Sequence, residues 1–150
     1  MSDLIDHMFE EGRISKHNYY LIKKIKERKK KKERYKMALY TLSLLILILC
    51  GVAIYCLFDG RVTQEQYALS LDSFLQNRFL FNLILAFIGL FLVFRFVGKR
   101  YEEVDRDYEK LRVEIINRSK ELWSHHYDPD SEGLVYDYLK KDYDINLFHK

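Results

Sequence analysis

The sequence contains little cysteine, and this shortage excludes a disulfide framework. Cys50 and Cys56 are the two cysteines, and both lie within one apolar run. Six positions along a helix place two side chains about 240° apart around its axis, so these thiols do not pair with each other. No Cys/His spacing typical of a structural metal site occurs either. We interpret both cysteines as small, polarisable packing residues.

Arrangements of catalytic groups are lacking as well. No nucleophile lies beside a base, no pair of carboxylates lies near the apolar runs, and no glycine-rich phosphate loop occurs. The sequence therefore predicts a protein that is not an enzyme, without catalytic residues or a cofactor. Acidic residues from Asp128 onward match the first positions of a calcium-binding loop, but Leu139 occupies the position of its bidentate glutamate. We expect Asp128 to cap a short helix, with Pro129 in its first turn, and the neighbouring His125 and His126 leave a metal site as the alternative.

Charge is absent from residues 37–58, a run of 22 residues. A helix of this length spans about 33 Å, enough to cross a hydrocarbon core of about 30 Å. The run is too long for a secretory signal, 36 residues precede it, and no small-residue cleavage site follows it. Residues 79–97 form a second apolar run of 19 residues, with Arg95 near its C-terminal end. The sequence thus predicts an all-α membrane protein, a two-span antiparallel helical hairpin with long cytoplasmic helical extensions.

Basic residues flank the two spans on one side. Lys and Arg number ten in residues 17–36 and six in residues 99–118, against two in the connecting residues 59–78. The positive-inside rule then places both termini in the cytoplasm, in a multi-pass protein of the plasma membrane. Within the extracytoplasmic loop, Thr63 begins a capping-box pattern, and we expect a short helix there on the outer membrane surface. The predicted segments are a basic, mostly helical N-terminus (1–36), transmembrane helix 1 (37–58), the loop (59–78), transmembrane helix 2 (79–97), its coiled-coil-like cytoplasmic continuation (98–124) and a cytoplasmic tail with a short helix (125–150).

The N-terminal segment leads into a long basic helix. Gly12 is expected to end a first short helix, and Ser15 to cap a second one that runs from Lys16 directly into the first span. Ten basic residues follow within residues 23–36, namely Lys23, Lys24, Lys26, Arg28, Lys29, Lys30, Lys31, Lys32, Arg34 and Lys36. We interpret this run first as a topology signal and second as a contact for anionic lipid of the cytoplasmic leaflet. Nucleic acid is the least favoured partner, because aromatic residues at base-stacking spacing are missing.

Small and polar residues predict how the two spans pack. In an antiparallel hairpin, residues at equal depth below the outer membrane surface lie at the same height. Asn82 then lies level with Tyr55, and Ala86 with Gly51. Gly89 shares a helix face with Ala86. Small residues let helices approach closely, and an amide inside a membrane needs a polar partner. We therefore expect these five residues to form the contact between the spans. The alternative for Asn82 is contact with an ion or a substrate.

A coiled-coil seam extends the second span. Apolar and aromatic residues alternate at spacings of four and three at Val97, Tyr101, Val104, Tyr108, Leu111 and Ile115, and Arg118 then interrupts the pattern. The partner of this seam is either the helix 16–36 of the same chain or the same helix of another copy. Since Arg28 and Lys32 interrupt the pattern in 16–36, a homo-oligomer is favoured. The apolar end 134–148 is expected to dock on the cytoplasmic helices or on a protein partner.

These features together resemble a known family. A basic N-terminal segment, a two-span hairpin, a charged helix and the ending Asp144-Ile145-Asn146-Leu147-Phe148 are similar to the YpbF-like family of small bacterial membrane proteins. The resemblance covers the whole chain and implies a bacterial plasma membrane. It brings no catalytic residues to this chain, because the family has no known activity.

Two classes of function fit these observations. The first is a non-enzymatic scaffold or interaction protein that acts through its cytoplasmic helices, at residues 97–115 and 134–148. The alternative is a small transporter or channel subunit, or a transport accessory protein, that acts as an oligomer. The spans contain few polar residues (Thr41, Ser43, Tyr55 and Asn82), which is little for a transport path.

Overall fold

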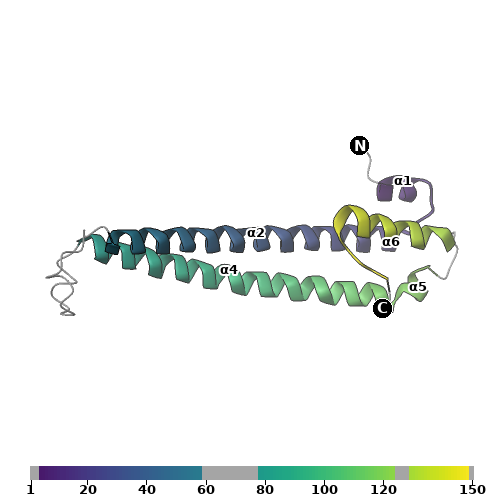
Figure 1. The fold of residues 1–150 in the computed structure, drawn as a ribbon. Helices are drawn as coiled ribbons and strands as arrows, with labels where there is room; N and C mark the ends of the chain where they lie inside the picture. The colour runs from purple at the N-terminus through teal and green to yellow at the C-terminus, as the bar shows by residue number, and fades with distance from the viewer. Residues whose placement is uncertain (1–3, 59–77, 124–128, 149–150) are drawn as a thin grey trace. The chain divides into compact units, whose positions relative to one another are not determined.

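The computed structural model describes residues 4–58, 78–123 and 129–148, which form helices joined by turns. In chain order the helices are α1 (Leu4–Glu10), α2 (Lys16–Phe58), α4 (Arg78–Asn117), α5 (Ser119–Trp123) and α6 (Pro129–Tyr143) (Figure 1). No strand occurs in these ranges, so the expected all-α fold is confirmed. The helix expected after Thr63 and the cap expected at Asp128 lie outside the described residues.

The start of α2 follows the predicted local signals. Gly12 has a φ of 72°, a left-handed conformation that glycine adopts at little cost, and it ends the turn after α1. The Ser15 Oγ accepts a hydrogen bond of 3.0 Å from the Asn18 N–H, which makes Ser15 the N-cap. From Lys16, α2 continues without a break to Phe58, so the predicted single helix is confirmed.

The second long helix ends earlier than predicted. A continuous helix to residue 124 is wrong, because α4 ends at Asn117 and α5 begins at Ser119. Arg118 lies between them, and its guanidinium pairs with Glu114 at 3.6 Å and with Glu121 at 3.0 Å. A buried guanidinium would lose its hydration, so the chain turns at Arg118 and places Ser119, rather than the arginine, in the buried position.

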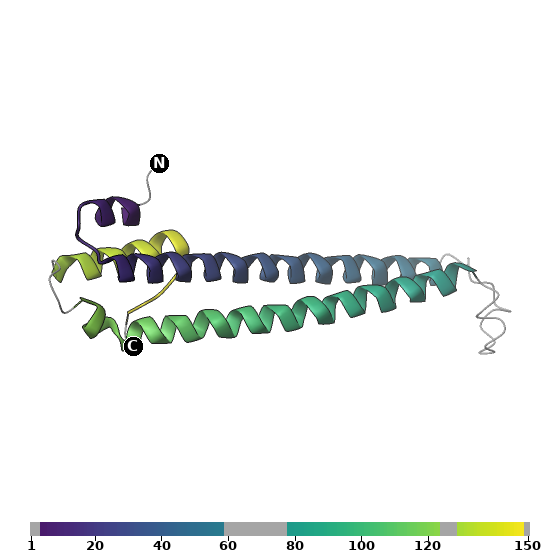
Figure 2. The ribbon, with the colours of Figure 1, turned by 180° about the vertical axis from the view of Figure 1, so that it is seen from behind.

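The described helices divide into two compact units. The helical unit comprises residues 1–34 and 102–150, and the hairpin comprises residues 35–101. Both long helices contribute to each unit, and within each their segments run antiparallel (Figures 1 and 2). The core of the helical unit contains apolar side chains from α1, the turn after it, α2, α4, α6 and the tail: Ile5, Met8, Ile14, Ile22, Ile25, Tyr108, Leu111, Ile115, Val135, Tyr136, Leu139, Ile145 and Leu147. Full burial of such a side chain contributes about 1.5–3 kcal/mol, so this unit has a core of its own.

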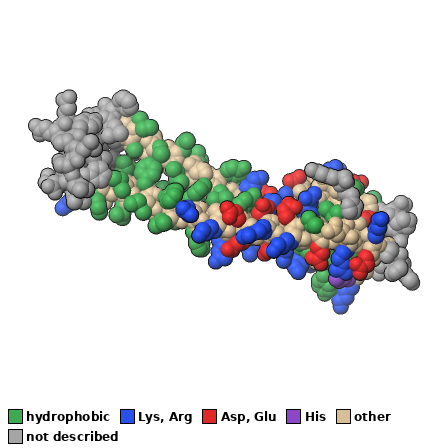
Figure 3. Space-filling view, turned by 90° about the horizontal axis from the view of Figure 1, so that it is seen from below, with side chains coloured by type: hydrophobic (Ala, Val, Ile, Leu, Met, Phe, Trp, Pro, Cys, Tyr) green, Lys and Arg blue, Asp and Glu red, His purple; other side chains and the backbone are tan. Residues whose placement is uncertain are grey.

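No buried residue occurs among the described side chains of the hairpin. Its partly buried residues recur at alternating spacings of four and three, at Leu42, Ile46, Leu49 and Ala53 on α2 and at Leu83, Phe87, Leu90, Phe94 and Val97 on α4. Many other apolar side chains among the described residues of the hairpin are exposed, and hydrophobic side chains cover this part of the molecule in Figure 3. No residue in the most apolar window of either helix is buried. By length and composition, both helices could cross a membrane.

The predicted contact between the spans is wrong. Gly51, Tyr55, Asn82, Ala86 and Gly89 are all exposed. A Cβ atom added at Gly51 or at Gly89 would meet no atom of the hairpin within 4 Å. These residues therefore do not form a close contact within the chain.

The rotation of α4 explains this difference. Its line of contact runs through Leu83, Phe87 and Leu90, each one position after a residue of the predicted face. One position along a helix rotates a side chain by about 100°, so the small residues face away from α2. Large side chains at spacings of four and three fill the contact instead, as in a coiled coil.

Candidate functional site

The predicted seam is buried within the helical unit. Val104, Tyr108, Leu111 and Ile115 are 4–8% exposed, and the last three belong to the same core cluster as Ile22 and Ile25 of α2. The inference that the N-terminal helix is a poor partner for this seam is therefore wrong, because the same chain covers these four residues. Association of two copies stays a prediction and requires a different surface.

Lysines continue the seam on α2. Lys29 and Lys32 follow Ile22 and Ile25 at spacings of four and three, and their side chains are only 13% and 17% exposed. Their ammonium nitrogens lie 5.9 and 4.7 Å from the ring centroid of Tyr108. A cation over an aromatic face is attracted by the ring, and the long lysine stems cover apolar surface. These two lysines of the predicted basic patch are thus inward-facing.

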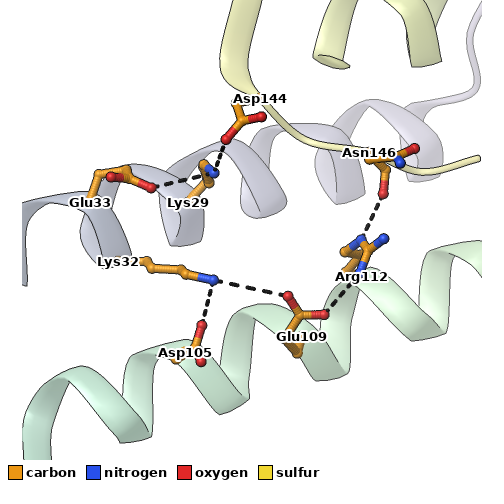
Figure 4. Close-up of polar contacts among 8 residues, drawn as sticks. All are labelled: Lys29, Lys32, Glu33, Asp105, Glu109, Arg112, Asp144 and Asn146. Carbon is orange, nitrogen blue, oxygen red and sulfur yellow. Dashed lines mark hydrogen bonds and ion pairs between the residues drawn. The ribbon is translucent and has the colours of Figure 1, made fainter. Parts of the chain in front are cut away.

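Acidic side chains from three segments neutralise this pair of lysines (Figure 4). Lys32 Nζ lies 2.5 Å from Asp105 Oδ1, as an ion pair without the alignment of a hydrogen bond, and 4.0 Å from Glu109. Lys29 Nζ lies 3.4 Å from Glu33 and donates a hydrogen bond of 3.0 Å to Asp144 Oδ2. The partners come from α4, from α2 itself and from the C-terminal tail.

The contacts of Lys29 and Lys32 with these acids form a charged layer, and Arg112 extends it toward the end of the chain. Its Nε donates a hydrogen bond of 2.7 Å to the Asn146 carbonyl oxygen, and its guanidinium lies 3.1 Å from Glu109 (Figure 4). Glu109 therefore contacts both Lys32 and Arg112. The layer joins α2, α4 and the tail by charged contacts around the Tyr108 ring.

Burial and nearby charges shift the pKa values of two groups in this layer. Burial raises the pKa of the Tyr108 hydroxyl, and the positive charges of Lys29, Arg112 and Lys32 only partly oppose this. Burial disfavours the charged form of Lys29, but the hydrogen bond and the negative charge of Asp144 outweigh it and raise the pKa of Lys29. Both groups therefore keep their protons to higher pH than they would in water.

The tail docks on the helical unit, as one of the two predicted options. Asp144 follows α6 with a φ of 54°, and the Ile145 N–H donates a hydrogen bond of 3.0 Å to the Leu139 carbonyl oxygen. This arrangement resembles the left-handed caps that commonly end helices, with aspartate in the usual place of glycine. Ile145 and Leu147 are 0% and 1% exposed, and the Phe148 ring lies edge-on to Tyr136 at 5.7 Å.

Two further basic residues of the predicted patch contact the helical unit. Lys26 Nζ lies 4.1 Å from the ring centroid of Tyr143 and 5.7 Å from that of Tyr138. The Arg28 guanidinium donates a hydrogen bond to the Asp107 carbonyl oxygen. Other members of the patch, namely Lys23, Lys24, Lys30, Lys31 and Arg34, are exposed, and Lys36 is partly buried. The basic run is therefore divided between two sides of one helix.

The described residues offer little for small-molecule chemistry. Among them, no group of three or more His, Cys, Asp or Glu side chains is placed to hold a metal ion. A cavity of about 50 Å³ lies between Asp6, Tyr19 and Lys23, where the Tyr19 hydroxyl donates a hydrogen bond of 2.8 Å to Asp6. Small-molecule sites are commonly about 300–1,000 Å³, so this cavity is too small for one. The pair His125 and His126 lies outside the described residues.

Comparison with known proteins identifies relatives of unknown function. Residues 21–150 match the model of DUF2663, which is described as a protein of unknown function. The uncharacterized protein YpbF of Bacillus subtilis (strain 168) is 31% identical over 80 residues, which cover 53% of this chain and 54% of YpbF. The chain thus spans about half the length of this curated relative. These matches confirm the resemblance to a YpbF-like family. No solved structure matches the chain.

Proposed function

The chain belongs to the DUF2663 family, whose function is unknown, and we propose that it is an integral membrane protein of the scaffold class. In this proposal α2 and α4 cross the plasma membrane as a hairpin, and both termini lie in the cytoplasm. The helical unit is held at the cytoplasmic face, where it binds a partner and catalyses no reaction.

The distribution of apolar surface carries this proposal. Side chains such as Leu47, at 69% exposed, and Leu85, at 60%, project from the hairpin, whereas the helical unit buries thirteen hydrophobic residues in one core. Water-soluble monomers rarely expose apolar patches larger than a few hundred Å². The twelve Leu, Ile, Val and Phe residues of 37–58 favour insertion into a membrane by roughly 4–7 kcal/mol. A membrane accommodates this surface, and water does not.

The charge asymmetry supports the proposed orientation. Basic residues concentrate in 17–36 and 99–118, next to the inner ends of the two proposed spans, and the connecting residues 59–78 contain two. Basic residues near a span favour the cytoplasmic side. The helical unit, which includes residues from both flanks, would then lie in the cytoplasm.

The helical unit supports an interaction role because its own core is complete. Within the predicted binding surfaces, Tyr108, Leu111 and Ile115 of the seam and Ile145 and Leu147 of the tail pack into the core of the same chain. Recognition is therefore assigned to outward-facing side chains, of which Tyr20, Val113 and Leu134 are large, apolar and about half exposed. Tyr20 lies on α2, Val113 on α4 and Leu134 on α6, so the three residues represent three different helices.

Extraction with alkaline carbonate tests membrane integration. The natural chain should stay with the membrane pellet, because alkaline carbonate releases proteins bound by charge but not spanning helices. A variant with Leu47→Lys and Ile88→Lys should be released or degraded, since each lysine near a span centre costs roughly 2.5–3.5 kcal/mol. Release of the natural chain into the supernatant would contradict the proposal.

Photocrosslinking in the native membrane tests the scaffold role. A photoreactive amino acid at Tyr20, Val113 or Leu134 should give a protein adduct of one defined mass from at least one position. The same group at the lipid-facing Leu85 serves as the control and should give lipid adducts. If all three positions of the helical unit give no protein adduct, the scaffold role is contradicted while membrane integration stands.

A further inference from the structure

The basic run on α2 has two sides with different surroundings. Lys29 and Lys32 face inward, toward Tyr108, Asp105 and Asp144. An exposed side of the same helix carries Lys16, Lys23, Lys24, Lys30, Lys31 and Arg34. At about 100° per residue these six side chains fall within roughly one third of the helix circumference. We call this exposed side the basic stripe, and the exposed Glu27 and Tyr20 lie on it between the basic residues.

Three residues at the end of this stripe have no counter-ion in the described part of the chain. Lys30, Lys31 and Arg34 are exposed, and their side chains form no ion pair or hydrogen bond with any described residue. Like charges held close on one helix face repel each other by a few tenths of a kcal/mol per pair. An anionic partner outside the chain would remove this repulsion.

The position of these three residues along α2 selects the partner. They precede Met37, the first residue of the proposed span, by three to seven positions, or about 5–10 Å of helix. The headgroup layer beyond the hydrocarbon core is about 5–8 Å thick on each side. Long basic side chains also reach along the helix toward an interface. Lys16, Lys23 and Lys24 begin about 20 Å from Met37 and lie beyond this layer.

We propose that Lys30, Lys31 and Arg34 bind the phosphate groups of anionic phospholipids in the leaflet that α2 enters. Lys29 and Lys32 are excluded from this contact because they hold the tail and α4. The inference rests on the proposed function, since it requires α2 to cross a membrane at Met37. It replaces a uniform ten-residue patch by a three-residue headgroup site and an internal structural pair.

The size of the expected effect follows from simple electrostatics. Each basic side chain close to an anionic membrane surface contributes about a fivefold preference for it. Three such side chains give a preference on the order of 100-fold, and added salt weakens it because exposed charges are screened. Distal basic residues contribute less, because they lie about two Debye lengths from the surface at physiological salt.

Lipid retention by the full chain in nanodiscs tests the site. The nanodiscs contain equimolar phosphatidylglycerol and phosphatidylcholine, and native mass spectrometry counts the lipids that stay bound to the released protein. The natural chain should retain mainly phosphatidylglycerol. The triple variant Lys30→Gln, Lys31→Gln, Arg34→Gln should lose most of this enrichment while keeping the melting temperature of its helical unit.

Two matched variants complete the experiment. The triple Lys16→Gln, Lys23→Gln, Lys24→Gln removes the same charge from the same face and should retain the enrichment. The double Lys29→Gln, Lys32→Gln should also retain it, but should lower the melting temperature. Equal losses in the proximal and distal triples would overturn the headgroup site, because they would show that attraction to anionic lipid is spread along the whole stripe. Unchanged enrichment in the proximal triple would also overturn it.

The same experiment also tests the proposed membrane function, by whether the chain incorporates into nanodiscs. If the natural chain does not incorporate into nanodiscs, the proposed membrane function fails, and the lipid site fails with it. If the chain incorporates but retains both lipids equally, only the lipid site is overturned.

Discussion

Asp144 Oδ2 lies 3.0 Å from Lys29 Nζ, although the two residues are separated by 115 positions in the sequence. This contact ties the C-terminal tail to the inward-facing side of α2, before the first apolar run. Asp144 is also the residue that directly follows α6, and it has a left-handed φ of 54°. The same side chain therefore has a structural role through its charge and through its backbone conformation.

Substitutions at Asp144 separate these two roles. Asparagine tolerates a left-handed backbone, so Asp144→Asn should lower the free energy of unfolding by less than about 1 kcal/mol, because the Asp144 side chain is 95% exposed and an ion pair to an exposed carboxylate contributes little. Asp144→Ala should be about 1–2 kcal/mol less stable than Asp144→Gly, because a Cβ is strained at positive φ. Urea unfolding followed by fluorescence of Trp123, the single tryptophan, measures these changes. Equal stability of the alanine and glycine variants would contradict the left-handed cap.

Leu111 tests the pairing of the seam within one chain. Leu111→Ala should lower the free energy of unfolding of the helical unit by about 2–5 kcal/mol, because it leaves a cavity in a closed core. The neighbouring Val113 is 49% exposed, and Val113→Ala should change it by less than about 0.5 kcal/mol. Neither variant should change the size of the detergent-solubilised protein. A smaller species from Leu111→Ala would instead indicate that the seam joins two copies.

Gly89 tests the orientation of α4 in the hairpin. Gly89→Ala should leave the melting temperature in detergent unchanged or raise it, because the added methyl group meets no atom and alanine favours helix by about 1 kcal/mol. Leu90→Ala, one position further, should lower the melting temperature because Leu90 lies in the line of contact. The opposite order of the two variants would restore the predicted small-residue contact. Circular dichroism during heating makes the measurement.

The buried tyrosines predict the response of the helical unit to alkali. Burial raises the pKa of Tyr108 and of Tyr136, and the pKa of Lys29 is also raised. Above about pH 10 the unfolded chain therefore loses protons that the folded chain keeps, and the free energy of unfolding falls as pH rises. The double variant Tyr108→Phe, Tyr136→Phe should show a shallower fall. Its control, the exposed Tyr20→Phe, should follow the natural chain, and a double variant with an unchanged slope would contradict the prediction.

The sequence predicted the elements that depend on local signals and long patterns. Ser15 marks the start of α2, and the uncharged residues 37–58 predict one of the two apolar helices. The four-three pattern at Val104, Tyr108 and Leu111 identified one face of the buried core. Each of these features depends on residues close together in the chain or on one helical period.

The sequence did not reveal which side chains face which partner. Lysine patterns are read as solvated surface, so the inward position of Lys29 and Lys32 depends on Tyr108 and on acids elsewhere in the chain. Counting their spacing from Ile25 would have placed both in the seam. In the hairpin, depth fixes the height of a residue but not its rotation, so Ala86 was assigned to the wrong face.

Topology in intact cells tests the central claim, a two-span hairpin with the helical unit in the cytoplasm. Single cysteines at Ser70, His17 and Asp137, in a chain with Cys50→Ala and Cys56→Ala, are exposed to a membrane-impermeant maleimide before and after lysis. Ser70→Cys should be labelled in intact cells, and His17→Cys and Asp137→Cys should be labelled only after lysis. Labelling of His17→Cys or Asp137→Cys from outside, or protection of Ser70→Cys until lysis, would contradict it.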